Sequence, residues 1–403
     1  MTDRPPLELD PIPASAVPLL SLAAFGSGVS MRAADPLLPL LASDFSVSVG
    51  DASLVITVFS IAYGLAQLGF GPMGDRYGKY FVIALAALAS AVTAAMCAGA
   101  ASLGALLAVR LLAGATAAAI IPLSMAWIGD VIPYEQRQPV LARFMIGQIL
   151  GLSSGVLVGG LAADAHQWRL PFLLVSAIFL LVGFGLLRLN RRLPPRAKAL
   201  RAIKGSALLH MVAEFRHIGS LPWARVVLVT VFLEGAALYG PFAFIASHLH
   251  HEHGVSLSLA GLVLMLFGFG GFAFAVAAAP MVGRLGEAGL SRWGGALLAL
   301  SLATIGATPV WWLAFPACFC AGLGFYMFHN TLQTNATQMA PDRRGAAVAS
   351  FASCFFMGQA VGVGVAGRLT THVSTGALLL GGAAGVLVVS LNFARRVNLR
   401  KAA

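Results

Sequence analysis

The chain has 403 residues, of which 59% are hydrophobic and only 10% are charged, and its formal net charge is +11. Soluble domains are ~45–50% apolar and ~25% charged, so this composition excludes an ordinary soluble domain. A membrane-spanning helix needs ~20 largely apolar residues, so the apolar content is enough for about twelve spans with little left over.

The hydropathy pattern predicts twelve transmembrane helices. The 45 glycines support close helix packing, because small residues let helices approach each other in lipid. We therefore expect an all-α membrane protein whose helices form two pseudo-repeated six-helix bundles. The predicted helices cover residues 16–40, 53–70, 81–101, 103–128, 140–162, 170–188, 224–247, 258–282, 293–308, 310–336, 346–367 and 374–393.

The first predicted helix contains two charged residues, Arg32 and Asp35, inside an apolar stretch. A charge at bilayer depth is costly unless it faces a cavity or a partner, so both are functional candidates. Their i,i+3 spacing puts them on one helix face, where they can neutralise each other. Pro36 and Pro39 follow, so the helix is expected to kink or end there. The alternative is a salt bridge at the rim of the membrane, where charge costs little.

A glycine-rich segment follows the second predicted helix. Glycine tolerates the backbone conformations that a tight turn requires, so we expect such a turn here. Asp75 is its single acidic residue and a candidate gating group. The alternative is a solvated turn that only sets the orientation of the chain. The candidate residues of this segment are Gly71, Gly74, Asp75, Arg76, Gly78 and Lys79.

Arg110 in the fourth predicted helix and Glu234 in the seventh are the other charges at bilayer depth. Arg110 can donate to a substrate anion or carbonyl, or bias the charge of a nearby carboxylate. Alternatively, it forms a structural ion pair between the first and fourth helices. Glu234 is the preferred proton carrier and Asp35 its competitor, because a lone buried carboxylate is costly when ionised and therefore protonates readily. The alternative for Glu234 is a permanently protonated or paired side chain.

Uncharged polar side chains also occur inside the spans, and several gather on the tenth predicted helix. In lipid such groups either line a cavity or form hydrogen bonds between helices. We favour a substrate cavity. The candidate residues are Gln67, Gln148, His329, Asn330, Gln333 and Gln359.

The segment from His248 to His253 is rich in histidine. We expect a solvated loop. Histidine-rich tracts can bind metal, and histidine titrates near neutral pH, so metal binding and proton sensing are the alternatives. The segment shows no fixed ligand geometry, and we predict no metal site.

Basic residues are distributed very unevenly between the two sides of the predicted protein. With the N-terminus inside, 22 of the 26 Lys and Arg residues fall on one side, and only Arg169 and Arg368 fall on the other. By the positive-inside rule, we expect a multi-pass inner-membrane protein with both termini in the cytoplasm. This distribution explains the net charge without a nucleic-acid partner.

The two halves of the chain are related in sequence. The segment Pro72–Gly78 matches Pro280–Gly286 at an offset of 208 residues. The pair Gly147 and Gly151 is echoed later by Gly358 and Gly362, and a glutamine follows the first glycine in each case. Repeated halves are typical of alternating-access transporters, whose substrate site lies between them.

A basic linker separates these halves, and its stretch from Lys204 to Arg216 could form an amphipathic helix on the inner leaflet. The predicted divisions are a cytoplasmic tail at 1–15, a bundle at 16–189, the linker at 190–222, a second bundle at 223–394 and a cytoplasmic tail at 395–403.

These motifs resemble the major facilitator superfamily over nearly the whole chain. The segment from Gly71 to Lys79 resembles the family signature between helices 2 and 3, and the spacing of Arg110 and Gly114 resembles the helix 4 arginine motif. Asp35, followed by its two prolines, resembles the end of helix 1 in drug:proton antiporters. The fifth helix resembles the antiporter motif, although Val156 stands where proline is usual. Its glycines are Gly151, Gly155, Gly159 and Gly160.

The resemblance implies a role for Asp75 as well as a fold. In the family, this aspartate contacts the N-terminus of helix 11 and holds the inner gate shut. Here that helix begins near Gly345, and a helix N-terminus favours a negative charge by ~0.3–1 kcal/mol.

The resemblance also implies secondary active transport. We expect proton-coupled efflux of a small organic compound by alternating access, with the substrate, the lipid bilayer and protons as partners. We expect no cofactor and no enzymatic activity. The chain contains no GxxxxGK[ST] loop, so direct use of ATP is not expected. The alternatives are an importer or uniporter of a small metabolite, and a non-transporting membrane sensor.

Overall fold

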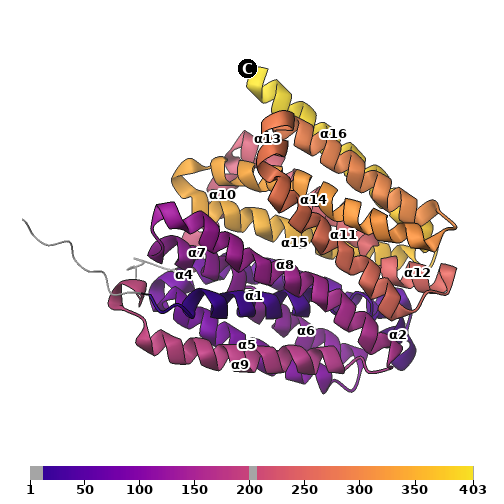
Figure 1. The fold of residues 1–403 in the computed structure, drawn as a ribbon, viewed down its shortest axis with the longest axis horizontal. Helices are drawn as coiled ribbons and strands as arrows, with labels where there is room; N and C mark the ends of the chain where they lie inside the picture. Colours follow the sequence, from indigo (N-terminus) through magenta and orange to yellow (C-terminus); the bar gives the residue numbers. More distant parts are fainter. Residues whose placement is uncertain (1–11, 199–206, 403) are drawn as a thin grey trace, which may run out of the picture.

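The computed structural model describes residues 12–198 and 207–402, and the described chain is helical with no strand (Figure 1). The predicted N-terminal tail lies mostly outside these ranges, as does Lys204 in the linker. The α-helices are α1 (Ala16–Arg32), α2 (Leu38–Asp44), α3 (Val49–Ala52), α4 (Leu54–Tyr77), α5 (Lys79–Ala98), α6 (Leu103–Ala117), α7 (Ile120–Val131), α8 (Tyr134–Asp164), α9 (Leu170–Arg192), α10 (Ala207–Ser220), α11 (Pro222–Phe242), α12 (Ile245–His253), α13 (Leu257–Ala307), α14 (Ala314–Gln338), α15 (Arg344–Leu369) and α16 (Thr375–Ala402).

The predicted number of spans is confirmed in the described chain. Ten helical stretches are long and apolar enough to cross a membrane. One of them, the 51-residue α13, is two spans joined at Gly286, whose non-helical backbone breaks the helix. The remaining span is α1 followed by α2, with a non-helical segment at residues 33–37 between them. The predicted kink or end before Pro36 is therefore present.

The two aligned segments of the sequence repeat each end in a turn at a glycine. Gly78 has a φ of 91° between α4 and α5, and Gly286 has a φ of 60° inside α13. Other residues adopt such positive φ values only rarely, because a Cβ atom clashes there. The predicted glycine turn is wrong in its extent, since α4 continues to Tyr77 and leaves Gly71 and Gly74 helical. Hydropathy marks the end of the apolar stretch, whereas the helix runs on to the first residue that breaks it.

The helices pack as two bundles. In the first, α1 packs on α8 and α9, α5 on α9, and α4 on α6; in the second, α11 packs on α15 and α16, and α13 on α14 and α16. The bundles meet mainly where α8 packs on α13 and where α4 packs on α15. Figure 1 shows the first bundle in indigo to magenta below the second in orange and yellow.

The two ends of the bundles differ in charge. The turns at Gly78, Pro133 and Gly286 lie at the end where α1 begins and α16 stops, and most described Lys and Arg residues lie near it, so we call it the basic end. The other end, which carries Trp168 and α12, is called the opposite end. The predicted amphipathic helix corresponds in part to α10, which lies at the basic end and contacts both α4 and α15.

The glycines of the helix 5 motif bring α8 against α1. A Cβ atom added at Gly151 would overlap the backbone carbonyl of Phe25, and one added at Gly159 would overlap that of Ala33. The second bundle repeats this contact, because a Cβ atom at Gly358 would overlap the carbonyl of Phe232 on α11. Gly155 faces Val29 in the same row, while Gly160 faces Leu257 of the other bundle.

We expect Gly151→Ala to destabilise the folded protein by ~1–3 kcal/mol, because an extra methyl group in a packed interface forces the backbones apart. The matched control is Gly129→Ala on α7, where an added Cβ atom meets no other atom within 4 Å. Thermal unfolding of the two detergent-solubilised variants measures the difference. Equal unfolding midpoints would show that the α1–α8 contact tolerates a side chain.

Candidate functional site

Arg32 and Asp35 form a buried ion pair where α1 ends. Arg32 Nη1 lies 3.1 Å from Asp35 Oδ2, and the exposed fractions of the two residues are 6% and 0%. The predicted pairing of these two charges is therefore present and is buried in the protein, while its depth in the membrane stays a prediction. Asp35 Oδ1 has no hydrogen-bond partner.

Arg110 connects three helices through backbone carbonyls. Its Nε donates to the carbonyl of Val55 at 3.2 Å and its Nη1 to the carbonyl of Ser30 at 3.1 Å. The guanidinium also lies 4.1 Å from the ring centroid of Phe59. The alternative of an ion pair between helices 1 and 4 is wrong for this structure, since no described carboxylate lies within salt-bridge distance of Arg110. Ser30 is in the last turn of α1, where carbonyls lack helical partners and accept from side chains.

Glu234 and His329 form the second buried polar pair. Glu234 Oε2 lies 2.8 Å from His329 Nδ1, so the pair connects α11 to α14. Glu234 is fully buried and its Oε1 has no partner. His329 stacks on Phe325 at 4.8 Å between ring centroids and lies 4.8 Å from Phe355. Glu234 is therefore paired with a second protonatable group in this structure and does not stand alone.

Tyr239 connects the two pairs, and the sequence analysis missed it. The Arg32 Cζ atom lies 3.9 Å from its ring centroid. Tyr239 also meets Phe325 and Phe355 edge to face, at 5.8 and 5.5 Å between ring centroids, and these two rings flank His329. Its position five residues after Glu234 in the same apolar helix was the available signal.

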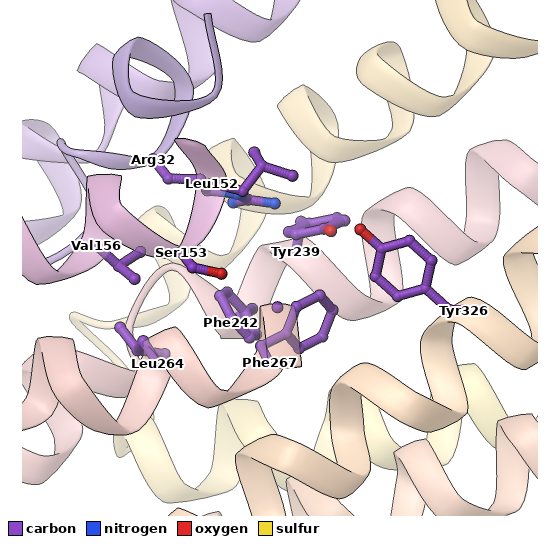
Figure 2. Close-up of a pocket in the computed structure, with 10 residues that line it drawn as sticks. Arg32, Leu152, Ser153, Val156, Tyr239, Phe242, Leu264, Phe267 and Tyr326 are labelled. Atoms are coloured by element: carbon purple, nitrogen blue, oxygen red, sulfur yellow. The ribbon is translucent and has the colours of Figure 1, made fainter. Parts of the chain in front are cut away.

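A small cavity lies between the bundles next to this tyrosine (Figure 2). Its volume is about 20 Å³, which is close to the ~10–15 Å³ that one water molecule needs. Among the predicted site residues, only Arg32 lines it. Its polar and aromatic lining residues are Arg32, Ser153, Tyr239, Phe242, Phe267 and Tyr326.

The predicted glutamines and asparagine do not line this cavity. Gln359 Nε2 donates to Ser60 Oγ at 3.0 Å and thereby bridges α15 and α4 between the bundles. Gln67 and Gln148 are not exposed, and each has one buried side-chain atom without a partner. On α14, His329 points at Glu234, while Asn330 is half-buried and Gln333 is exposed, because successive helical residues face in different directions.

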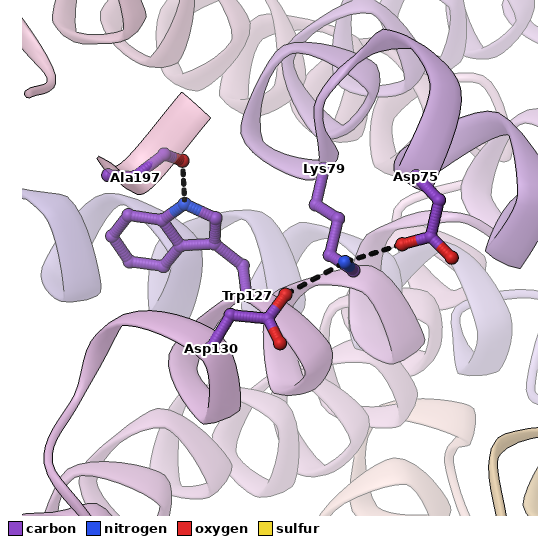
Figure 3. A network of polar contacts seen from close by, with 5 residues as sticks. All are labelled: Asp75, Lys79, Trp127, Asp130 and Ala197. Atoms are coloured by element: carbon purple, nitrogen blue, oxygen red, sulfur yellow. Dashed lines mark hydrogen bonds and ion pairs between the residues drawn. The ribbon is translucent and has the colours of Figure 1, made fainter. Parts of the chain in front are cut away.

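The turn at the basic end holds a charged network (Figure 3). Lys79 Nζ lies 2.6 Å from Asp75 Oδ1 and 2.8 Å from Asp130 Oδ2, so it connects the end of α4 to α7. Asp130 was not predicted, because nothing in the sequence places it near Lys79. Asp75 is therefore paired within its own turn here, and its contact with the helix N-terminus near Gly345 stays a prediction.

Asp164 joins the two bundles at the opposite end. Its Oδ1 accepts from the backbone N–H of Leu257 at 2.8 Å, and its Oδ2 accepts from that of Ser258 at 2.9 Å. The carboxylate of α8 therefore caps the N-terminus of α13, where a negative charge is favoured. Close backbone approaches between Gly50 and Gly367 lie near the same end.

The histidine segment is part of the helix α12 and not a loop, although His251 and Glu252 on it are exposed. His248 is buried, with Nδ1 2.8 Å from Thr375 Oγ1 and Nε2 3.1 Å from the carbonyl oxygen of Ile305. It therefore links α12 to α16 and α13. Within the described residues, no group of three or more His, Cys, Asp or Glu side chains is arranged to hold a metal ion.

Comparison with known proteins adds to this geometry. The sequence profile of the Major Facilitator Superfamily matches residues 20–363 and 232–399. The chain is 24% identical over 367 residues to an uncharacterised MFS-type transporter, YceJ, of Bacillus subtilis, a match that covers 90% of this chain and 91% of the relative. It is 29% identical over 149 residues to the multidrug export protein EmrB of Haemophilus influenzae, covering 37% of this chain and 29% of that protein.

Solved structures show the same fold at low sequence identity. The nucleoside transporter NupG superposes with a TM-score of 0.75 at 16% identity, covering 94% of this chain and 98% of that one. A D-xylose–proton symporter superposes with a TM-score of 0.73 at 16% identity, covering 94% and 97%.

Proposed function

The chain belongs to the major facilitator superfamily and is a multi-pass membrane transporter, and from this premise we propose that it exports a small organic compound in exchange for protons. Export is supported by similarity to proteins such as EmrB, a multidrug export protein. We further propose that the basic end faces the cytoplasm at the inner membrane, that both termini lie there, and that no nucleic acid binds.

The main support for proton coupling is the Glu234–His329 pair. Both side chains can take up a proton, and they lie 2.8 Å apart at a depth where Glu234 is fully buried. An uncompensated charge at this depth costs free energy. We therefore expect the pair to gain or lose a proton when its surroundings change from closed to open to water. Tyr239 lies against Arg32 at the cavity between the bundles, and it contacts Phe325 and Phe355, the two rings that flank His329.

Alternating access is supported by where the bundles touch. We propose that residues 16–189 and 223–394 move as two units. The contacts of Asp164 with α13, of Gly50 with Gly367, and of Ser60 with Gln359 run from the opposite end to the middle of the bundle interface. These contacts support a state that is closed at the opposite end. They must separate for that side to open.

Uptake into proteoliposomes tests the function. Purified protein is reconstituted, and a panel of labelled organic compounds is offered with a pH gradient and after its collapse by nigericin. We expect at least one compound to accumulate only with the gradient. Equal rates with and without the gradient would favour a uniporter. No transport of any compound by correctly folded protein would favour a non-transporting membrane sensor.

We expect Asp164→Ala to shift the protein towards the state open at the opposite end, because two hydrogen bonds to a charged acceptor are lost, each worth ~1.5–3 kcal/mol. The readout is labelling of Ser153→Cys by an impermeant maleimide from that side, in a background without the four native cysteines. Labelling should become at least several times faster. Glu252→Ala is the control, since Glu252 is an exposed acidic residue at the opposite end and takes no part in these contacts between the bundles. Equal labelling rates in the two variants would remove Asp164 from the gate.

A further inference from the structure

The cavity between the bundles offers hydrogen-bond donors from several sides. Of the residues that the structure describes, Arg32 is the only charged one that lines it, and its Cζ atom lies 3.9 Å from the ring centroid of Tyr239. Among the described residues, the hydroxyl groups of Ser153, Tyr239 and Tyr326 have no hydrogen bond to another side chain or to the backbone. In Figure 2, the Tyr326 hydroxyl points towards Tyr239, and Ser153 faces them from the other bundle. A bound molecule that supplies acceptors would satisfy these groups.

The two acidic residues near the cavity are each paired with another side chain and do not line the cavity. Asp35 is fully buried with Oδ2 on Arg32, and Glu234 is fully buried with Oε2 on His329. Neither carboxylate lines the cavity. A bound molecule therefore meets the guanidinium of the Arg32–Asp35 pair and not its carboxylate, so the pair offers hydrogen-bond donors to an anionic group and no carboxylate to an ammonium group.

The remaining walls are apolar, and several of them are aromatic rings. Phe242 and Phe267 meet edge to face at 5.0 Å between ring centroids, and Tyr239 lies 5.7 Å from Phe242. Aromatic walls favour a planar aromatic guest, which can stack or meet their edges. Because Ser153 belongs to α8 and Phe267 to α13, the walls come from both bundles, and the cavity widens when the bundles move apart.

We propose that this cavity is the substrate site and that the substrate is a planar aromatic compound with an anionic acceptor group, such as an aromatic carboxylate, and not an organic cation. The proposal rests on the proposed transport function for its biological role. It makes Arg32 the residue that selects the charge of the substrate, while the rings of Tyr239, Phe242 and Phe267 select its shape.

Binding of three probes with one ring system tests this charge preference. Naphthoate, naphthamide and naphthylmethylammonium are titrated into the purified full-length protein in nanodiscs, without any gradient. We expect naphthoate to bind about tenfold or more tightly than naphthamide, since a charge-assisted hydrogen bond is replaced by a neutral one. We expect no saturable binding of the ammonium compound. Tighter binding of the ammonium compound, or no saturable binding of naphthoate, would overturn the proposal.

Variants then assign the preference to Arg32. Arg32→Gln alone leaves Asp35 without its partner and can misfold, so the double variant Arg32→Gln with Asp35→Asn keeps the buried site neutral. We expect the double variant to bind naphthoate and naphthamide within about twofold of each other. Arg169→Gln, at the exposed opposite end, should keep the wild-type preference. Naphthoate affinity unchanged in the double variant would also overturn the proposal.

The same probes separate this inference from the proposed transport function. If naphthoate binds as expected while no compound of the panel, naphthoate included, is accumulated under a pH gradient, proton-coupled export fails and the site assignment stands. If another compound is accumulated under the gradient while naphthoate does not bind, the site assignment fails and proton-coupled export stands.

Discussion

Replacing Glu234 by glutamine should reduce substrate accumulation driven by a pH gradient to the level of protein-free liposomes, while exchange of substrate across the membrane continues. The glutamine amide keeps the size of the side chain and can still hydrogen-bond to His329, so the helices α11 and α14 stay connected. It cannot take up or release a proton, however, so the proton gradient can no longer drive transport. Glu234 is fully buried, so its charge is costly unless compensated.

Two measurements on the same proteoliposomes separate coupling from general damage. Accumulation under a gradient reports coupling, and counterflow of labelled against unlabelled substrate reports binding and movement alone. Glu252→Gln on α12 is the control, because Glu252 is an exposed acidic residue at the opposite end. If Asp35→Asn abolishes accumulation and Glu234→Gln does not, the proton carrier lies on helix 1. If neither variant loses accumulation, proton coupling through these carboxylates is wrong.

The sequence predicted those parts of the site whose partners are close in the chain. The Arg32–Asp35 pair follows from an i,i+3 spacing, and the positions of the turns at Gly78 and Gly286 follow from an internal repeat. The partner of Glu234 is 95 residues away on another helix, and sequence spacing cannot reveal which helices face each other. Both were nevertheless candidates, because polar side chains inside apolar stretches stand out individually.

Sequence patterns could not predict which backbone carbonyls accept hydrogen bonds or which aromatic rings meet. Arg110 bonds to two main-chain carbonyls, and every residue has a carbonyl, so no sequence signal marks those of Ser30 and Val55. Tyr239 contacts Arg32 and the two rings that flank His329, but one aromatic residue in an apolar helix is indistinguishable in sequence from an ordinary core residue. The glycine motif of α8 was recognised as a family pattern, and only the structure assigned it to close contact with α1.

Arg110→Ala should reduce both gradient-driven accumulation and counterflow by at least about tenfold, because it removes two charge-assisted hydrogen bonds worth ~1.5–3 kcal/mol each. These bonds tie α6 to α1 and α4 next to the Arg32–Asp35 pair, so their loss misplaces the cavity wall as well as the charges. Arg110→Lys should be intermediate, since an ammonium group lacks the planar fork that reaches both carbonyls.

Arg169→Ala provides a matched control for this loss. Arg169 also donates through Nε to a backbone carbonyl, that of Ala98 at 3.1 Å, but it is exposed at the opposite end. Its removal should leave both transport modes near the wild-type level. If Arg110→Ala instead retains counterflow and loses only accumulation, then Arg110 acts by biasing the charge of a carboxylate. If it retains both, the carbonyl contacts are replaceable by water and the residue is not part of the transport site.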